Sequence, residues 1–442
     1  MPVPGQTNAP TDIRPAERAA LGILTRAFPP ELVDQVLIEC GRVEQRNRLL
    51  PARVVVYFVL AMAMFAEQSY PEVAHLLISD LERERWWPKG RQLPTPAAIG
   101  RARLRLGPEP LRRLFERTCP PPASRTVTDA WYRGRRLVAL DGAILDVPDT
   151  PPNAAHFGRA LGSTVRKPVR TTGPRTTGPR AADPRATGPR ATDPRATGRP
   201  PVRPAAQEPV SYPQARVSAL IECGTHTTLT ADVGPLSTHE RALAEAIYPL
   251  LTRDMLVLAD RGTTDPAIWQ AARAGGADLL WQVPISLQLP LATRLEDGSH
   301  LIGPTTATDL TGSTGPTGPT RPTGPTGPGR ERACPTQVRV IDYTLDTDRP
   351  STPPHRLLTS LLDPAVAPAA DLAARYTHQS RTGTALDHLT PPQPAQTLRS
   401  RHPEGIEQEI FALLLLHRAF PATPTAQASP TPPTVQLVSA PD

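Results

Sequence analysis

Lysine is almost absent from this chain of 442 residues. Of its 49 lysines and arginines, all except Lys89 and Lys167 are arginines. We attribute this to coding composition rather than to function. Cysteine is also scarce, and its four copies stand singly, without the CxxC or CxH spacing of a metal-binding pair. This pattern argues against a zinc site and against a disulfide framework, and it indicates a reducing compartment.

The sequence also lacks a long hydrophobic run. The longest apolar stretch, residues 54–65, falls short of the ~20 residues that span a bilayer. The first residues, MPVPGQTNAPTDIRP, contain no basic region followed by an apolar core, so we expect no secretion signal. The expectation is therefore a cytoplasmic protein without a membrane partner.

Proline, by contrast, is abundant. The chain has 57 prolines and only 39% hydrophobic residues, so part of it is not packed structure. Residues 171–200 repeat a five-residue unit of the type TTGPR, and residues 311–330 read TGSTGPTGPTRPTGPTGPGR. Proline in each repeat unit removes a backbone donor, so neither a helix nor a sheet can propagate there. We expect disorder in four segments, residues 1–17, 163–208, 311–330 and 421–442.

The net charge of +7 and the isoelectric point of about 9.6 point at first to a nucleic-acid partner. Residues 166–203 alone carry ten basic and two acidic residues, a net of +8, so the remainder of the chain is −1. The folded part is thus close to neutral, and a DNA-binding surface on it must be a local patch. The arginine-rich repeat either grips phosphates without sequence specificity or serves as an inert linker.

Residues 18–125 read as a small all-α domain. Apolar residues recur at three- and four-residue spacing in stretches such as ERAALGILTRAF, PELVDQVLIECGRV and EPLRRLFERTC. The stretch LPTPAAIGRARLRLG has the Thr-Pro start typical of a helix and then places Arg101, Arg103 and Arg105 on an arginine-rich face. From the pattern alone, these arginines are equally well explained as a solvated helix face.

Two aspartates are the most informative residues of the chain. Asp141 follows the apolar run 137–140, and Asp260 follows the apolar run 255–259. Each run reads as a buried strand that stops at a carboxylate. Carboxylates at strand ends are held by the sheet yet face solvent, and two or three of them can hold hard divalent cations for displacement at phosphorus. Taken singly, each aspartate could instead merely cap a turn.

The sequence around these aspartates resembles DDE-type transposases of bacterial insertion sequences, of the insertion-element-4 type. The resemblance rests on blocks that occur in the family's order between about residues 137 and 417, namely LVALDGAILDVPDTPPNAAHFGR, VSALIECGTHTTLTADVGP, LVLADRG, GGADLLWQV, RVIDYTL, HRLLTSLLDP and LRSRHPEGIEQEIFALLLLH. It implies an α/β fold with a ribonuclease-H-like core over residues 130–420, which contains a β-rich insertion at 279–357 and follows the all-α domain.

The resemblance also implies functional roles. It makes Asp141 and Asp260 the first two catalytic residues and ligands of a Mg²⁺ or Mn²⁺ pair. It makes the N-terminal helical domain a DNA-binding domain for the element's ends, in a nucleoid-associated protein whose partners are double-stranded DNA at the element ends and the target. It leaves a homodimer open. The implied DNA contacts are Arg101, Arg103, Arg105, Arg261 and Tyr376.

The third catalytic position departs from the family. The family's final motif runs Tyr, two residues, Arg, three residues, Glu, six residues and Lys on one helix. Anchoring this motif on Tyr376 places Gln379, Gly383 and Thr390 at the Arg, Glu and Lys positions. Gly383 offers no metal ligand, and Asp387, one turn further along, is the acidic residue that could replace the lost one.

Two classes of function therefore compete. The first is an active transposase that cuts and joins DNA by two-metal phosphoryl transfer. The second, which the missing carboxylate favours, is a catalytically impaired relative that keeps the fold and DNA binding. A third hypothesis is a proline-rich interaction protein whose tracts engage aromatic grooves.

The same blocks predict the order of the core elements. We expect strands at 137–147, 215–223 and 227–233, a helix at 239–251, a strand ending at Asp260 and a helix at 266–274. Short β segments should follow to about residue 357, and helices at 370–389 and 404–418 should complete the fold.

Overall fold

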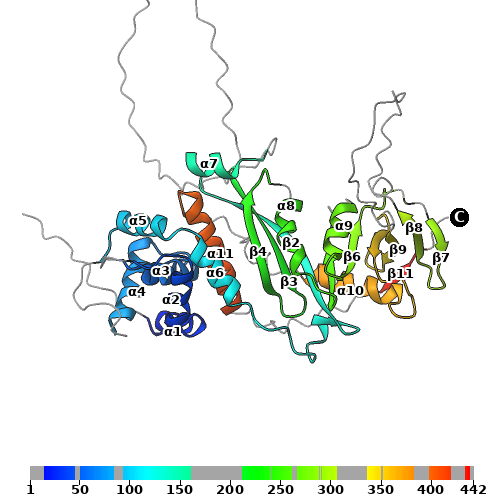
Figure 1. Ribbon diagram of the computed structural model, residues 1–442, viewed down its shortest axis with the longest axis horizontal. Coiled ribbons are helices and arrows are strands. Elements are labelled where there is room, and N and C mark those ends of the chain that lie inside the picture. Colours follow the sequence, from blue (N-terminus) through cyan, green and yellow to red (C-terminus); the bar gives the residue numbers. More distant parts are fainter. Residues whose placement is uncertain are drawn as a thin grey trace, which may run out of the picture.

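The computed structural model of the chain has helices at one end and a long sheet extending from them (Figure 1). It describes residues 14–44, 50–83, 93–160, 212–238, 240–260, 266–287, 289, 291–305, 336–349, 352–382, 398–419 and 434–438. The predicted disordered tracts 163–208 and 311–330 lie outside the described residues. No helix in the described part is both long and apolar enough to cross a membrane.

The N-terminal region is helical, as the apolar spacing predicts. Proline stands in the first turn of five of its helices, where the missing amide costs no hydrogen bond. The Thr95 side chain caps one of them by accepting a hydrogen bond from the Ala98 amide at 3.2 Å. The helices are α1 (Pro15–Ala27), α2 (Pro30–Glu39), α3 (Ala52–Met64), α4 (Tyr70–Arg83), α5 (Pro96–Leu106) and α6 (Glu109–Arg117).

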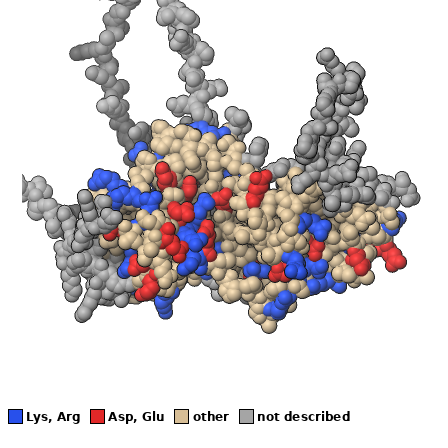
Figure 2. All heavy atoms as spheres, viewed as in Figure 1, with Lys and Arg blue, Asp and Glu red and all other residues tan. Residues whose placement is uncertain are grey.

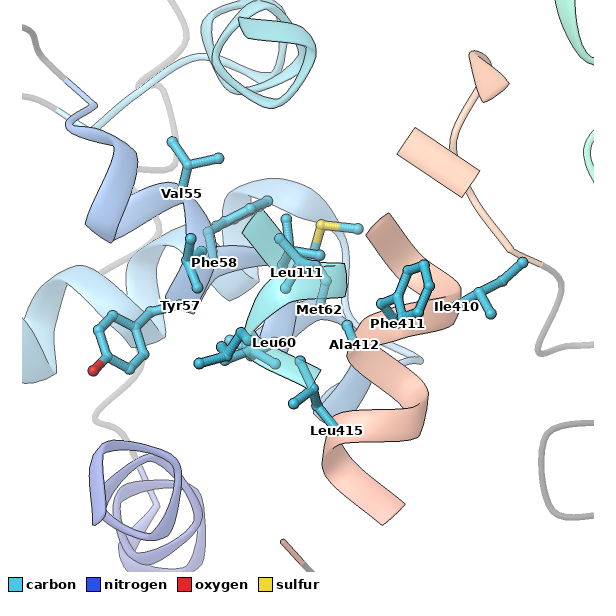
Figure 3. Packing of buried hydrophobic residues seen from close by; sticks show 14 of the residues in the cluster. Val55, Tyr57, Phe58, Leu60, Met62, Leu111, Ile410, Phe411, Ala412 and Leu415 are labelled. Atoms are coloured by element: carbon cyan, nitrogen blue, oxygen red, sulfur yellow. The ribbon is translucent and has the colours of Figure 1, made fainter. Parts of the chain in front are cut away.

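The last long helix of the chain, α11 (Pro403–Ala419), completes this helical layer. Its residues Ile406, Ile410, Phe411 and Leu415 are fully buried in the same apolar cluster as the core of α3. Figure 3 shows Phe411 and Leu415 of α11 beside the side chains of the N-terminal helices. The helical layer is therefore built from both ends of the chain, although α11 belongs by sequence to the predicted segment 130–420.

The remainder of the described chain forms one sheet with helices packed on it. Its strands are β1 (Trp131–Tyr132), β2 (Arg135–Asp146), β3 (Gln214–Glu222), β4 (Thr227–Pro235), β5 (Met255–Ala259), β6 (Asp278–Val283), β7 (Leu291–Arg294), β8 (His300–Thr305), β9 (Thr336–Leu345), β10 (His355–Thr359) and β11 (Val435–Leu437). The helices between these strands are α7 (Pro151–Phe157), α8 (Glu240–Glu245), α9 (Pro266–Arg273) and α10 (Ala369–Thr382).

The first five long strands have the arrangement of a ribonuclease-H-like core. Their spatial order is β4-β3-β2-β5-β6, in which β3 is antiparallel to β2 and to β4. Strands β5 and β6 run parallel to β2. A helix precedes β5 and another joins β5 to β6, as crossover connections between parallel strands require. The predicted fold class is confirmed by this strand order.

The β-rich insertion extends the same sheet instead of forming a separate layer. Strand β10 pairs with β6, and β9, β8 and β7 follow it. In this extension the side chain of Arg339 is fully buried and pairs with Asp297. Asp297 Oδ2 also accepts the Ala369 amide at 2.9 Å, and Arg339 donates to the carbonyls of Leu361 and Ala367. The insertion thereby holds the start of α10, whose N-terminal partial charge favours a carboxylate.

Three features correct the expectations from sequence. The tail 421–442, predicted to be disordered, contains strand β11, which adds to β9 through backbone hydrogen bonds that composition does not reveal. The N-terminal segment 1–17, also predicted to be disordered, overlaps α1, which starts at Pro15. Strand β2 confirms the predicted strand 137–147 but not the interpretation that it stops at Asp141, because it pairs with β3 for five residues beyond that position.

A buried arginine joins α11 to the N-terminal helices of the helical layer. Arg103 of α5, 4% exposed, donates to Gln408 Oε1 at 3.1 Å, the Tyr70 hydroxyl at 2.7 Å and the Gly405 carbonyl at 2.8 Å. Its guanidinium also pairs with Glu409 at 2.8 Å. A Cβ on Gly405 would lie 2.1 Å from the Ser400 hydroxyl and 3.2 Å from Arg103 Nη2, so the contact requires glycine. Arg103 is thus a structural residue.

Replacing Arg103 with Met should destabilise the protein by about 3–5 kcal/mol, because it leaves the buried Glu409 carboxylate without its charged partner. Urea unfolding of the full chain measures this loss. The matched control is Arg105→Met on the same helix, an exposed side chain whose loss should cost less than about 0.5 kcal/mol. Equal effects for the two variants would contradict the structural role of Arg103.

Asp297 should make stability depend on pH. Burial alone would raise the pKa of its carboxyl, but hydrogen bonds from Ser299 and the Ala369 amide, together with Arg339, outweigh burial and hold the pKa below its usual value. The stabilisation from a depressed pKa is present above the unfolded value, near 3.8, and is lost as the pH falls through the lower folded value. Asp297→Asn should therefore lower the unfolding free energy at pH 7.

The difference between Asp297→Asn and the unsubstituted chain should shrink below about pH 3.8, and urea unfolding from pH 7 to pH 3 measures it. Asp371→Asn serves as a control, since Asp371 pairs with Arg133 on the surface and 51% of its side chain is exposed. A difference for Asp297→Asn that stays constant with pH would contradict the prediction.

Candidate functional site

The pairing of β2 with β5 places the two predicted aspartates side by side. The register of this parallel pair ends with Leu140 opposite Ala259. Asp141 and Asp260 are the next residues on the two neighbouring strands, which lie about 4.8 Å apart in such a sheet. The structure therefore brings together the two carboxylates that the sequence identified separately.

Both aspartates belong to the face of the sheet that α10 covers. Side chains alternate between the faces of a strand, and Leu137 of β2 and Leu258 of β5 are buried in one cluster with Leu372 and Tyr376 of α10. Asp141 and Asp260 continue the same alternation. Beyond Asp141, β2 packs on this face against the helical layer instead, through Ala143 and Leu145. The aspartates therefore lie at the boundary between the part of this face that α10 covers and the part that the helical layer covers.

The two carboxylates differ in their surroundings. Asp141 is half-buried inside β2, and its Oδ1 accepts the Gly142 amide at 2.8 Å. Asp260 directly follows β5 and is exposed. The expectation that the strand ends at the carboxylate is confirmed for Asp260 and is wrong for Asp141. What ends at Asp141 is the pairing with β5, so its side chain still reaches the carboxyl edge of the parallel strands.

Tyr376 lies next to this site but is not placed to contact DNA. It is 4% exposed, and its hydroxyl donates to the carbonyl of Ala259, the residue before Asp260, at 3.1 Å. The prediction of a DNA contact is therefore corrected, because the side chain is enclosed between α10 and the sheet. Its hydroxyl holds α10 against the end of β5.

Position 383 lies just beyond the described part of α10. Seven residues after Tyr376 is just under two helical turns, which is the same helix face if the helix continues. Gln379, at the family's Arg position, is buried, and its Nε2 donates to the Asp129 carbonyl at 3.4 Å. Gly383 and Asp387 lie outside the described residues. Glycine at position 383 supplies no side-chain ligand in any backbone conformation.

The described residues do not form the donor set of a two-metal site. No group of three or more His, Cys, Asp or Glu side chains suited to a metal ion occurs among them. Asp141 and Asp260 provide two carboxylates, which suit a single Mg²⁺ or Mn²⁺ that takes its other ligands from water and phosphate oxygens. Two cations carry four positive charges, and two carboxylates offset only half of them.

The predicted arginine contacts have different environments. Arg103 is buried, as described above, so it cannot contact DNA and that prediction is wrong. Arg101 is exposed, and no ion pair joins it to another described residue. Arg105 is exposed at 41% and lies 3.9 Å from Glu44. Arg261 lies outside the described residues.

Arg399, which was not identified from the sequence, anchors the segment just before α11 to α3. The guanidinium of Arg399 donates to the carbonyls of Met62, Phe65, Ala66 and Gln68 at the end of α3, where helix carbonyls lack partners. The Arg399 amide also donates to Glu409 at 2.6 Å. The block LRSRHPEGIEQE contains these polar residues just before a buried helix, which is the signal that could have indicated an anchor.

The strand order and the paired aspartates define a protein of the ribonuclease-H-like class. Residues 18–116, which cover α1 to α6, match the family described as insertion element 4 transposase N-terminal. This match covers the helical layer, whereas the aspartates lie in the sheet that follows it.

Comparison with curated proteins covers both parts. The chain is 26% identical over 392 residues to the transposase InsG for insertion sequence element IS4 of Escherichia coli K12, over 88% of this chain and 73% of InsG. It is 23% identical over 258 residues to the putative transposase InsZ of the same organism, over 58% of this chain and 69% of InsZ. Among solved structures, a piggyBac transposase synaptic complex with hairpin DNA has a TM-score of 0.37 and 10% identity, over 90% of this chain and 75% of that one.

The family match and both relatives support a transposase of the insertion-element-4 type. The family named from the sequence blocks is thus confirmed. The helical layer carries the family match, and the sheet carries the aspartate pair.

Replacing Tyr376 with Phe should lower the unfolding free energy by about 1–2 kcal/mol, because the Ala259 carbonyl loses its donor in a buried position. DNA affinity should stay unchanged, since the hydroxyl is enclosed. Urea unfolding and fluorescence anisotropy with a DNA duplex measure the two quantities. Unchanged stability with weakened DNA binding would restore Tyr376 as a DNA contact.

Proposed function

We propose that this chain binds double-stranded DNA as a transposase-family protein in which strand cleavage is impaired. The proposal is supported by a difference within the candidate site, between the pair of aspartates and the third position of the family's motif. The pairing of β2 with β5 keeps Asp141 beside Asp260, whereas the position that the family fills with glutamate is Gly383. The fold is retained, and the third carboxylate is missing.

The charge pattern of the helical layer supports DNA binding at α5 rather than at α6. On α6, Arg113 pairs with Glu39 and Glu116 at 2.9 Å, and Arg117 lies 3.5 Å from Glu39. Figure 2 shows acidic and basic side chains intermingled over this helix. Phosphates would have to displace these carboxylates, so α6 is a poor surface for DNA.

Helix α5 provides the better surface. Its exposed arginines Arg101 and Arg105 stand on a helix that is fixed to α11 through Arg103. Arginine donates to phosphate oxygens through a rigid, always charged fork. A small number of such contacts also fits a folded part whose net charge is close to zero. We therefore propose Arg101 and Arg105 as phosphate contacts, and we propose the element ends and the target DNA as the ligands.

The carboxylate count supports impaired cleavage. Two-metal phosphoryl transfer needs a cation at the attacking oxygen and another at the leaving oxygen. Asp141 and Asp260 would hold one Mg²⁺ or Mn²⁺, which would polarise a phosphate bound across them. With Gly383 in the third position, that position supplies no side chain to hold the second cation. We expect weak metal binding and cleavage reduced by several orders of magnitude.

DNA binding is tested best with the full chain, because α11 completes the core of the helical layer. Replacing both Arg101 and Arg105 with Ala should weaken binding to a duplex and reduce the slope of log affinity against log salt by about 1.8, since each phosphate contact contributes about 0.9. Fluorescence anisotropy over a range of salt concentrations measures this slope. The control Arg113→Ala, which removes a paired arginine, should leave the slope unchanged. Equal slopes for all three proteins would contradict a contact at α5.

Cleavage is tested with a plasmid that carries the element with its own ends, in the presence of Mn²⁺. The unsubstituted chain should show no cleavage above background. A variant with Gly383→Glu, Gln379→Arg and Thr390→Lys should gain cleavage, and adding Asp141→Ala to that variant should abolish it. Robust cleavage by the unsubstituted chain that Asp141→Ala removes would show that the chain is an active transposase. If the triple variant gains no cleavage activity, residues outside the third motif must also be defective.

A further inference from the structure

A short loop before α11, residues 400–402, presents two basic side chains to solvent. Arg401 and His402 are both exposed, and no ion pair joins either of them to another described residue. Their side chains take no part in holding the fold, unlike that of the neighbouring Arg399, whose guanidinium binds carbonyls at the end of α3. Both basic side chains are therefore available to a ligand.

The backbone of this loop is fixed by buried polar side chains. Asn153 Nδ2 donates to the Ser400 carbonyl at 3.0 Å, and the Thr150 hydroxyl donates to the Arg401 carbonyl at 2.9 Å. Within the loop, the Ser400 hydroxyl donates to the His402 carbonyl at 2.9 Å and accepts the His402 amide at 3.2 Å. A ligand that binds the two exposed side chains therefore meets a backbone that is already ordered, which lowers the entropic cost of binding.

The acidic residues near the loop do not pair with it. Asp149, which precedes Thr150, pairs instead with Arg159. Glu404, in the first turn of α11, forms no ion pair with Arg401 among the described residues. This differs from α6, whose arginines pair with glutamates. The guanidinium of Arg401 is always charged, so the loop offers an unpaired positive charge to an anionic partner.

The loop lies beyond the carboxyl end of β2, on the face of the sheet that carries Asp141. Side chains alternate along the strand, so this face continues to Val147, which is buried in one apolar cluster with Ile406 of α11. Thr150, which binds the Arg401 carbonyl, follows three residues later. From Asp141 to Val147 the chain extends about 20 Å at 3.4 Å per residue. The aspartate pair and the loop are therefore successive points along one face.

Helix α5 lies next to the other side of the loop. Arg103 of α5 donates to the Gly405 carbonyl at 2.8 Å, and a Cβ on Gly405 would collide with the Ser400 hydroxyl, so these groups are in contact. Figure 1 shows α5, the start of α11 and α7 next to one another. The loop therefore lies between the end of β2 and the helix that carries the exposed Arg101 and Arg105.

We propose that Arg401 and His402 contact the phosphates of the duplex that α5 binds, at a point between α5 and the two aspartates. This inference rests on the DNA binding proposed above and adds the path of the duplex to it. Arginine donates to phosphate oxygens through its guanidinium, and imidazole has an N–H donor in either charge state. At 3.4 Å per base pair, the 20 Å along β2 correspond to about six base pairs. The duplex reaches the aspartates from the side of the helical layer.

Salt-dependent binding of the full chain tests this contact. In Arg401→Ala, the slope of log affinity against log salt for a duplex with the element's end should fall by about 0.9, the contribution of one phosphate contact. Arg401→Lys should keep the slope, because lysine also neutralises a phosphate. The matched control is Arg349→Ala, which removes an exposed arginine in the β-rich insertion and should leave the slope unchanged. Fluorescence anisotropy measures the slopes, and urea unfolding checks that each variant is folded.

The outcomes separate this contact from the proposed function. Adding Arg401→Ala to the double variant of Arg101 and Arg105 should lower the slope by about 2.7 in total, since separate contacts on one duplex add. An unchanged slope for Arg401→Ala, with a reduced slope for the double variant, would overturn the contact and leave DNA binding at α5 intact. An equal loss in Arg349→Ala would also overturn it, because net charge would then explain the effect. Failure of the unsubstituted chain to bind the duplex would overturn both proposals.

A tethered cleavage probe tests the position of the DNA independently of affinity. An iron chelate that generates hydroxyl radicals is attached to Arg401→Cys, in a chain whose native cysteines other than buried Cys223 are replaced by Ser. The bound duplex should be cut near the probe. The same probe on Arg349→Cys should cut several-fold less, because that position is remote from the proposed path. Equal cutting from the two positions would overturn the proposal.

Discussion

The parallel pairing of β2 with β5 joins segments that are separated in sequence by more than a hundred residues, and the other elements are arranged around it. Both faces of this pair are buried, one beneath α10 and the other beneath α8 and α9. Hydrophobic burial on two faces fixes the register, because a shift of one residue would turn each apolar side chain to the opposite face. That register also decides which residues follow the pair at its carboxyl edge, and these are Asp141 and Asp260. The position of the candidate site is therefore a consequence of core packing.

The helical layer is held to this sheet by arginine rather than by apolar contact alone. Arg418 donates to backbone carbonyls of Thr228 and Leu229 in β4 and stacks over Phe115 of α6, with 3.5 Å from its Cζ to the ring centroid. Burial lowers the pKa of Arg418 to about 10, which still leaves it charged at neutral pH. Arg399 holds the end of α3 in a similar way. An arginine side chain has five N–H donors, and a helix end or strand edge has several free carbonyl acceptors. One guanidinium can therefore bind several carbonyls at once.

Local patterns in the sequence were sufficient to predict most of the elements. The strands β2 to β5, helix α9 and helix α11 were expected within a few residues of their observed bounds, because alternation and helical spacing are short-range signals. The pairing of the aspartates was expected from the family resemblance and is explained by the register.

Contacts between distant segments could not be predicted in this way. Arg103 and Arg105 look alike in the sequence, yet one is buried and the other exposed, because Tyr70 of α4 and residues of α11 cover only one side of α5. The union of the β-rich insertion with the core sheet and the pairing of β11 with β9 depend on backbone groups that carry no sequence signature. Residues 383–397, which contain the Glu and Lys positions of the family's motif, lie outside the described residues. The loss of a metal ligand is therefore inferred only from the identity of Gly383.

The participation of α11 in the helical layer also bears on how the chain is made. Arg103 and its partner Gln408 are 305 residues apart, so the core of the first hundred residues stays incomplete until the ribosome has synthesised α11. At about 5–20 residues per second, that delay is about 15–60 s. During this time the apolar faces of α3 and α6 are available to chaperones or to other nascent chains. A message truncated before α11 would leave even an intact N-terminal segment with an incomplete core.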